Sequence, residues 1–197
     1  MVELVSADDP DVICLQEIPV WALRHLEAWS GMRAVTALAR RPRVWSAEVG
    51  RWITEVNHGL FRSAVTGEAD AILVARRYGT SDERVEVVST SGLRRIVHGV
   101  RLDDGLFVAN CHTTGEDQLA RVADFVRDEP QVVVAGDVNL RPPYAALHGF
   151  SQPLDKSIDQ VLVRGLPATP PVAWPVDRRR IAGGVVSDHA PVDVRIG

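Results

Sequence analysis

Short runs of apolar residues, many of them β-branched, recur along the chain and end in polar or turn-forming residues. Runs rich in valine and isoleucine that are bounded by Gly, Asp, Asn or Pro are typical of β-strands. The pattern therefore predicts a protein rich in β-sheet. The predicted strands span residues 11–18, 71–77, 84–90, 94–102, 106–112, 131–137, 158–165 and 189–196.

Helical periodicity is clearest in two segments. VWALRHLEAW (20–29) has apolar residues at positions 20, 23, 26 and 29, and GEDQLARVADFVRDE (115–129) carries a stripe of Leu119, Val122, Phe125 and Val126. Each helix follows a predicted strand, which indicates layers of helix on sheet. The proline-rich segment 166–184 is predicted to be an irregular loop.

The bulk properties favour a single domain over residues 1–197. The chain is 46% hydrophobic, which is enough for one sizeable core. No apolar run approaches the roughly 18–20 residues of a membrane helix, and the first residues are acidic where a secretory signal would be basic and then apolar. Cys14 and Cys111 lie in strand-like runs without metal or redox spacing, so we expect buried free thiols. These features predict a soluble cytoplasmic protein and leave its oligomeric state open.

The basic and acidic residues of the chain nearly balance, and the net charge is −4. Sequence-independent binding to duplex DNA depends on many contacts from lysine and arginine to phosphates. The charge therefore argues against a surface that is basic throughout, and it is compatible with a local phosphate site.

The stretch VVVAGDVNL (132–140) ends a buried strand in Gly136 and then places Asp137 and Asn139 two positions apart. Residues two apart share one face of a strand, and α/β proteins commonly place their chemistry at the carboxyl end of a buried strand. By itself the pattern is more typical of a simple turn held by backbone hydrogen bonds. The same spacing recurs in Asn110 and His112 at the end of LFVANCH (106–112).

Further acidic and histidine residues stand at strand boundaries. Glu17 ends DVICLQE, Asp159 begins DQVLV, and Asp188 and His189 precede APVDV. Taken singly, each could be a solvated strand end, a turn residue or a core histidine. Asp188 and His189 can serve one site only where the chain bends into its strand, which Pro191 favours. Three consecutive residues do not easily line up in a row of hydrogen bonds, which argues against a hydrolase triad of Ser187, Asp188 and His189.

Taken together in order, these stretches resemble the endonuclease/exonuclease/phosphatase superfamily, the metal-dependent phosphoesterases with a deoxyribonuclease-like fold. The resemblance implies an α/β (α+β) protein, a four-layer sandwich of two packed mixed β-sheets flanked by helices. The matching stretches are LQE (15–17), NCH (110–112), GDVN (136–139), SIDQVLV (157–163) and SDHAPV (187–192).

The resemblance also implies a metal site. Glu17 would hold the metal against a phosphate oxygen, with Asp188 assisting directly or through water. Gathered carboxylates repel one another: a like-charged pair ~4 Å apart costs about 1 kcal/mol in water and about 4 at an effective dielectric near 20. A divalent cation removes this repulsion, and oxygen ligands favour Mg²⁺ or Mn²⁺ over zinc.

The remaining residues take catalytic roles by the same resemblance. Asp137 and Asn139 would orient and deprotonate a water for in-line attack at phosphorus, and His189, held by Asp159, would bind the phosphoryl oxygens. His112 would contact the phosphate or protonate the leaving oxygen, and Asn110 would contact the substrate.

One part of the family pattern has no counterpart in this sequence. The family begins with a strand whose Asn helps to hold the metal, whereas residues 1–12 resemble the end of the following helix. The strand could lie upstream or be replaced by another segment or a partner chain. A shortened, weak or inactive relative that serves as a binding or scaffold protein is the third interpretation.

The substrate is expected to be a phosphoester, with nucleic acids, lipid headgroups and small phosphoesters all compatible with the motifs. Nucleic-acid contacts would come from basic side chains, and stacking would come from tryptophans, although solvated charges and packed tryptophans are common alternatives. The candidates are Arg76, Arg77, Arg94, Arg95, Arg178–Arg180, Trp45, Trp52 and Trp174.

Overall fold

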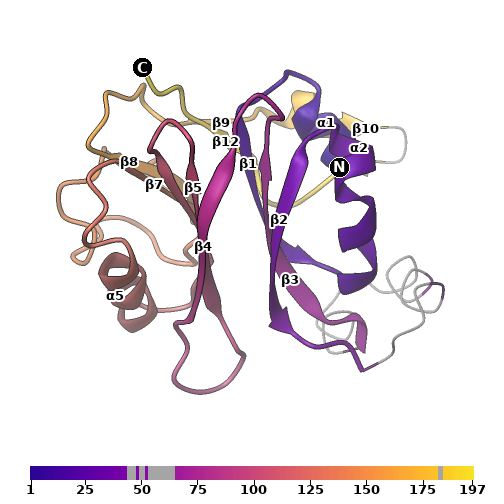
Figure 1. Ribbon diagram of the computed structural model, residues 1–197, viewed down its shortest axis with the longest axis horizontal. Coiled ribbons are helices and arrows are strands. Elements are labelled where there is room, and N and C mark those ends of the chain that lie inside the picture. The colour runs from indigo at the N-terminus through magenta and orange to yellow at the C-terminus, as the bar shows by residue number, and fades with distance from the viewer. Residues whose placement is uncertain (44–47, 49–51, 53–64, 182–183) are drawn as a thin grey trace.

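Two β-sheets lie face to face in the computed structural model, which describes residues 1–43, 48, 52, 65–181 and 184–197 (Figure 1). The first sheet is antiparallel and has the strand order β1-β3-β2. Its strands are β1 (Val12–Ile18), β2 (Arg33–Arg40) and β3 (Glu68–Val74).

The second sheet has five strands in the order β4-β5-β6-β7-β8. It is mixed, because β6 and β7 are parallel and the other neighbours are antiparallel. Parallel neighbours need a crossover connection, and α5 (Glu116–Phe125) supplies it. The strands are β4 (Thr80–Val87), β5 (Ile96–Leu102), β6 (Phe107–His112), β7 (Val132–Asp137) and β8 (Asp159–Arg164).

Helices cover the outer faces of both sheets and complete four layers. On the first sheet, Val2 and Leu26 pack on Ala71 and Leu73 of β3. The covering elements are α1 (Val2–Ser6), the 3₁₀ helix η1 (Val20–His25) and α2 (Leu26–Ser30). On the second sheet, α5 packs its apolar stripe on a core that contains Phe107. The predicted four-layer α+β fold is confirmed, and none of the described helices is long and apolar enough to cross a membrane.

The interface between the sheets is apolar at one end and polar at the other. Ile72 and Val74 of β3 pack against Val100 and Val108 of the second sheet. Alternate residues of a strand share a face, so the buried Glu68 of β3 points into the same interface. Glu68 therefore marks the end of the sandwich at which polar side chains gather.

Several elements differ from the sequence-based predictions. Strand β2 was not predicted, because its burial alternates weakly and arginines stand at both of its ends. The predicted strand 189–196 is reduced to β12 (Val192–Asp193), which pairs with β9 (Val172–Ala173) inside the predicted loop. That loop also contains the 3₁₀ helix η2 (Val176–Arg179) and the pair β10 (Arg180–Ile181) and β11 (Gly184–Val185). Prolines shorten these strands because proline cannot donate to a strand ladder.

The two remaining expectations concern the cysteines and the amino terminus. Cys14 and Cys111 are free thiols, as predicted, and burial raises the pKa of Cys14 to about 12. The first residues form helix α1, also as predicted. Among the described residues β1 is hydrogen-bonded to β3 alone and is therefore one edge of its sheet.

Gly136 in β7 has a φ of +143°, and an added Cβ would lie 1.9 Å from the carbonyl oxygen of Cys111. Gly136→Ala should lower the free energy of unfolding by roughly 1–3 kcal/mol of backbone strain plus roughly 1–3 kcal/mol of overpacking. Urea denaturation measures the change. Gly105→Ala is the control, because Gly105 has a φ of +93° but nothing within 4 Å of an added Cβ. Equal losses for the two variants would contradict the close approach at Gly136.

Candidate active site

Four of the predicted residues lie together at the polar end of the sheet interface. His112 and Asp137 end the parallel strands β6 and β7 in register, and Asp159 begins β8 opposite Asp137. Glu17, near the end of β1, reaches them from the other sheet, and its Oε1 is 3.8 Å from Nδ1 of His112. Strand direction and sheet packing therefore gather residues that lie up to 142 positions apart.

His189 joins this group from the loop before β12. Its Nδ1 is 2.9 Å from Oδ1 of Asp159 and 3.8 Å from Oδ2 of Asp137. Burial acts to lower the pKa of His189, but the hydrogen bond to Asp159 and the charges of Asp159, Asp137 and Asp188 together raise it above its ordinary value. The positive imidazolium is therefore stabilised beside these carboxylates.

Hydrogen bonds fix the loop that follows Asp137. The backbone N–H of Asn139 donates to Oδ1 of Asp137 at 2.9 Å, and the Asn139 side chain donates to the carbonyl of Thr113. Asn139 has a φ of +51°, a conformation that asparagine tolerates better than most residues. Oδ2 of Asp137 then faces both His112 and His189, at 3.7 and 3.8 Å.

The carboxyl of Asp137 is perturbed by its surroundings. Burial raises its pKa most, and the charges of Asp159 and Glu17 add to the rise, while the N–H of Asn139 and the charge of His189 oppose it. A raised pKa makes this carboxylate a better acceptor of a proton from water.

Glu17 reaches the site through an irregularity of its strand. The register between β1 and β3 shifts between Leu15 and Ile18, and Glu17 has a φ of +56°. Such bulges re-aim side chains near functional sites. The carboxylate of Glu17 is half exposed, so it lies at the mouth of the site.

Glu68 and Arg95 complete the side of the site where Glu17 and His112 lie. The sequence alone did not assign them to the catalytic group. Buried Glu68 and buried Arg95 form an ion pair, with 2.9 Å between Oε1 and Nη1. The same Nη1 lies 2.8 Å from Nδ1 of His112. Burial first, and then the charges of Arg95 and His189, lower the pKa of His112 to about 3. The sequence contained one indication of this role. Glu68 is a charged residue two positions from Asp70, on the inward face of β3.

Asn110, the residue expected to contact the substrate, lies in the sheet interface. Its side chain is fully buried, and Nδ2 donates to the carbonyls of Leu15 and Ala71 at 2.9 and 3.1 Å. Its Oδ1 accepts a hydrogen bond from Gln16. Asn110 thus joins β6 to β1 and β3 below the site, and both polar atoms of its side chain are hydrogen-bonded within the protein.

Among the described residues, the carboxylates and histidines form two groups whose possible ligand atoms lie within 4.8 Å of one another, Glu17–Glu68–His112 and Asp137–Asp159–His189. Nη1 of Arg95 already lies among the first group. Around Asp137 the charges of Asp159 and Glu17 accumulate, and the charge of His189 opposes them. Excess carboxylate charge beside half-exposed Glu17 fits a hard divalent cation. Asp188 is exposed and belongs to neither group.

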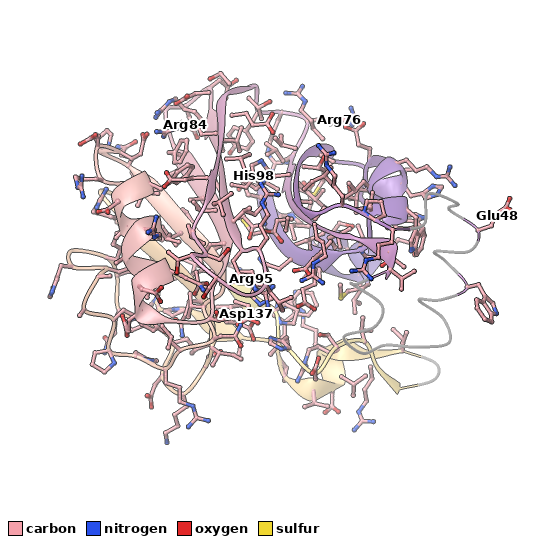
Figure 2. The ribbon with its side chains drawn as sticks, turned by 90° about the horizontal axis from the view of Figure 1, so that it is seen from below. Glu48, Arg76, Arg84, Arg95, His98 and Asp137 are labelled. Atoms are coloured by element: carbon pink, nitrogen blue, oxygen red, sulfur yellow. The ribbon has the colours of Figure 1, made fainter. Side chains whose placement is uncertain are left out.

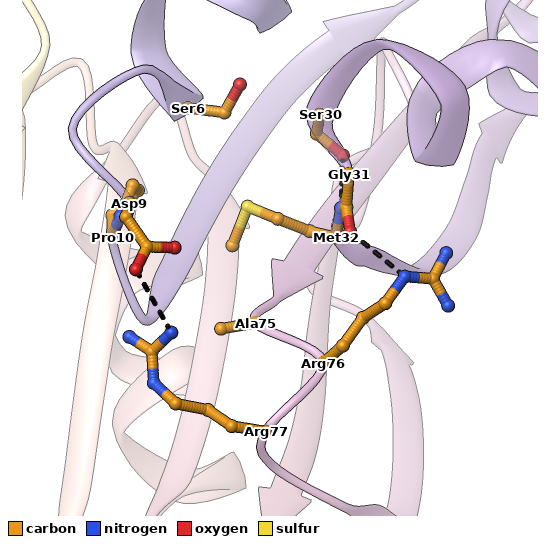
Figure 3. Close-up of a pocket in the computed structure, with 9 residues that line it drawn as sticks. All are labelled: Ser6, Asp9, Pro10, Ser30, Gly31, Met32, Ala75, Arg76 and Arg77. Carbon is orange, nitrogen blue, oxygen red and sulfur yellow. Dashed lines mark hydrogen bonds and ion pairs between the residues drawn. The ribbon is translucent and has the colours of Figure 1, made fainter.

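The other basic candidates lie elsewhere or have structural partners. Arg76 and Arg77 lie past the far end of β3, where they pair with Glu27, Asp9 and Asp11 around a separate pocket (Figure 3). Figure 2 shows Arg95 and Asp137 close together near the centre of the view and Arg76 at its upper edge. Arg76 and Arg77 therefore lie away from the candidate site, as the alternative of a solvated charged surface holds.

The C-terminal arginines brace the loop of His189. Nη1 of Arg179 donates to the carbonyls of Ser187 and His189 at 2.9 and 3.1 Å. Arg178 stacks on buried Trp174, with its guanidinium carbon 3.5 Å from the ring centre. Trp174 is therefore a packing anchor. Trp52 is exposed, and Trp45 lies outside the described residues.

Similarities to known proteins show the family and the fold of this chain. A model of the Endonuclease/Exonuclease/phosphatase family matches residues 1–189. No curated protein matches the chain. A functionally unknown conserved protein from Enterococcus faecalis V583 is similar in structure, with a TM-score of 0.70 and 16% identity over 100% of this chain and 88% of that one.

Two further structures are TDP2 proteins. TDP2 from Caenorhabditis elegans has a TM-score of 0.66 and 17% identity, over 99% of this chain and 66% of that one. TDP2 from D. rerio, crystallised with a single-strand DNA product, has a TM-score of 0.65 and 15% identity, over 95% of this chain and 86% of that one. At these identities the likeness shows the fold.

The pair of His189 and Asp159 generates a prediction about titration. His189 should titrate above its ordinary value of 6.5, and Asp159→Asn should lower its pKa, because both the hydrogen bond and the charge of Asp159 raise it. NMR titration of the histidine ring measures this. The linked stabilisation is fully present below the unfolded-state pKa and is lost as pH rises through the raised folded-state pKa. Exposed Asp128→Asn is the control, and a similar shift in that variant would contradict the assignment.

Proposed function

Because the chain belongs to the endonuclease/exonuclease/phosphatase family, we propose that it is a divalent-metal-dependent phosphoester hydrolase of the phosphodiesterase or endonuclease type. The observation that carries this proposal is the convergence of Glu17, His112, Asp137, Asp159 and His189 at one end of the sheet interface. Such a set supplies a base, a fixed imidazolium and metal ligands within one site.

Mg²⁺ or Mn²⁺ is the proposed cofactor. Glu17 would hold it from the mouth of the site, and Asp188 would assist from the loop of His189. When bound, the ion would neutralise carboxylate charge and polarise a phosphoryl oxygen. The gathered negative charge around Asp137 supports this assignment.

Asp137 is the proposed base. Its Oδ1 is occupied by the N–H of Asn139, so Oδ2 is the oxygen that would accept a proton from the attacking water. Asn139 would hold Asp137 in this orientation, and water would then attack phosphorus in line with the leaving oxygen. The raised pKa of Asp137 supports its use as the base.

The two histidines would bind the phosphoryl group. The bond to Asp159 raises the pKa of His189 and so favours its charged form, which would neutralise charge that develops on the phosphoryl oxygens. His112 lies across from it, with Nε2 facing Asp137. Together they would surround the reacting phosphorus with hydrogen-bond donors.

A nucleic-acid strand is the substrate that the surrounding charges favour. Arg40 is paired in register with Glu68, so the exposed Arg41 and Arg43 that follow lie toward the site end of the sandwich. Arg94 is exposed there too, and its Nη1 donates to the carbonyls of Leu38 and Ala39. Guanidinium groups beside the site suit a substrate with phosphates on both sides of the cleaved bond.

The activity test uses bis-p-nitrophenyl phosphate and a single-stranded oligonucleotide, each with Mg²⁺, Mn²⁺ or EDTA. Asp137→Asn and His189→Ala should each lower kcat by roughly 10²–10⁴-fold, because each removes a group that moves or neutralises charge in the transition state. Exposed Asp128→Asn and His148→Ala are matched controls and should retain activity. Turnover that persists in EDTA would contradict the proposal, and absence of turnover with every metal would favour the binding or scaffold role.

Metal binding has a separate readout in thermal stability. At a Mg²⁺ concentration about 100 times its Kd, a ligand of the native state alone adds about 2.7 kcal/mol, which raises Tm by roughly 5–10 °C for a chain of this size. Glu17→Gln should remove most of this rise. The Asp128→Asn control should keep it, and a Tm that does not respond to Mg²⁺ or Mn²⁺ would contradict the metal site.

A further inference from the structure

The guanidinium of Arg95 lies at the centre of the group formed by Glu17, Glu68 and His112. Arg95 directly precedes β5 and is 7% exposed. Its Nη1 is 2.9 Å from Oε1 of Glu68, 2.8 Å from Nδ1 of His112 and 4.0 Å from Oε1 of Glu17. Nη1 carries two hydrogens, so it can donate one to Glu68 and one to His112 at the same time.

The contact with Arg95 decides which nitrogen of His112 carries hydrogen. A guanidinium has donors only and stays protonated in proteins. At 2.8 Å, Nδ1 of His112 must therefore accept the hydrogen bond through its lone pair. A hydrogen on Nδ1 would place two donors against each other. The hydrogen of the neutral ring is accordingly on Nε2.

Nε2 is the ring atom that faces the reaction centre. It lies 3.7 Å from Oδ2 of Asp137, the oxygen that also faces His189. The N–H of His112 thus points toward the space in which a phosphoryl oxygen would bind beside the attacking water. A neutral Nε2–H is a good hydrogen-bond donor and a very poor source of protons.

Glu68 holds the guanidinium in this position. Both partners of the pair are buried, with side chains 9% and 5% exposed. A buried cation without a partner is strongly unfavourable, and so is a buried carboxylate. Glu68 therefore balances the charge of Arg95 and, through the second hydrogen of Nη1, directs the first hydrogen toward His112.

We propose that Arg95 and Glu68 are positioning residues that hold His112 in its Nε2–H tautomer, so that His112 donates a hydrogen bond to a phosphoryl oxygen and exchanges no proton with the substrate. The tautomer follows from the contacts of the protein alone, whereas the phosphoryl contact rests on the proposed function. This assignment selects between the two roles that the family resemblance left open for His112.

The tautomer is measured directly by long-range ¹H–¹⁵N NMR on the full chain with ¹⁵N-labelled histidine, without metal or substrate and near neutral pH. The signals of His112 are assigned by their loss in His112→Gln. The expected spectrum shows Nδ1 without hydrogen and Nε2 with hydrogen. A spectrum with hydrogen on Nδ1, or on both nitrogens, would overturn the proposal.

Arg95→Met removes the donor and should yield a mixture of tautomers at His112. It should also lower kcat by about 10–100-fold, as loss of a residue that orients an active-site ligand commonly does, with a smaller change in KM. Glu68→Gln should also yield a mixture of tautomers at His112, because the amide no longer balances the charge of the Arg95 guanidinium.

Arg101→Met is the matched control. Arg101 belongs to the same strand, β5, and pairs with buried Glu129 at 2.8 Å, so its loss also breaks an ion pair with a buried carboxylate. It should leave the spectrum of His112 and kcat unchanged. Retention of the Nε2–H tautomer and of kcat in folded Arg95→Met would overturn the proposal. If Arg95→Met does not fold, the wild-type spectrum and Glu68→Gln decide it.

The two proposals fail differently. An inactive wild-type protein with the expected spectrum would reject the phosphoester hydrolase and retain the tautomer assignment. An active protein with hydrogen on Nδ1 of His112 would retain the phosphoester hydrolase and reject the tautomer assignment.

Discussion

The hydrogen bonds of Asn110 tie the two sheets together directly below the candidate active site. Its amide nitrogen donates to Leu15 of β1 and Ala71 of β3, and its oxygen accepts from Gln16. The site is built from the ends of strands in both sheets, so its geometry requires that β1 keep one position relative to β6 and β7. A buried amide that would lose all of its hydrogen bonds on sliding resists such movement.

Charge balance is the second constraint. Carboxylates from several strands meet at one end of the interface, and burial raises the pKa of Asp137 and, with the charge of Glu68, raises the pKa of Asp70 to about 7. Among the described residues, Arg95 and His189 oppose this accumulation. Arg95 pairs with Glu68 beside Glu17, and the raised pKa of His189 favours an imidazolium beside Asp137 and Asp159. The remaining negative charge is what a divalent cation would neutralise.

The two ends of the sheet interface have different functions. The apolar end, with Ile72 and Val100, stabilises the sandwich by burying hydrocarbon. The polar end contains buried charges that cost free energy unless they are paired. The stability lost at the site is offset by the apolar packing on the same strands, and the irregular backbone at Glu17 is held in place by that packing.

The sequence by itself determined the strand ends, the order of the acidic and histidine residues and, through them, the family and its four-layer fold. The strand ends and the motifs are local, because alternation along a strand and the residues that end it follow from neighbouring positions, and the fold followed from the family that the ordered motifs resemble. Only the tertiary structure decided that Glu68 and Arg95 join His112, that Asn110 holds the sheets, and that Arg76 and Arg77 lie away from the site. Those outcomes depend on contacts between residues 17 to 95 positions apart, and such contacts are fixed by how two sheets pack, which no local pattern specifies.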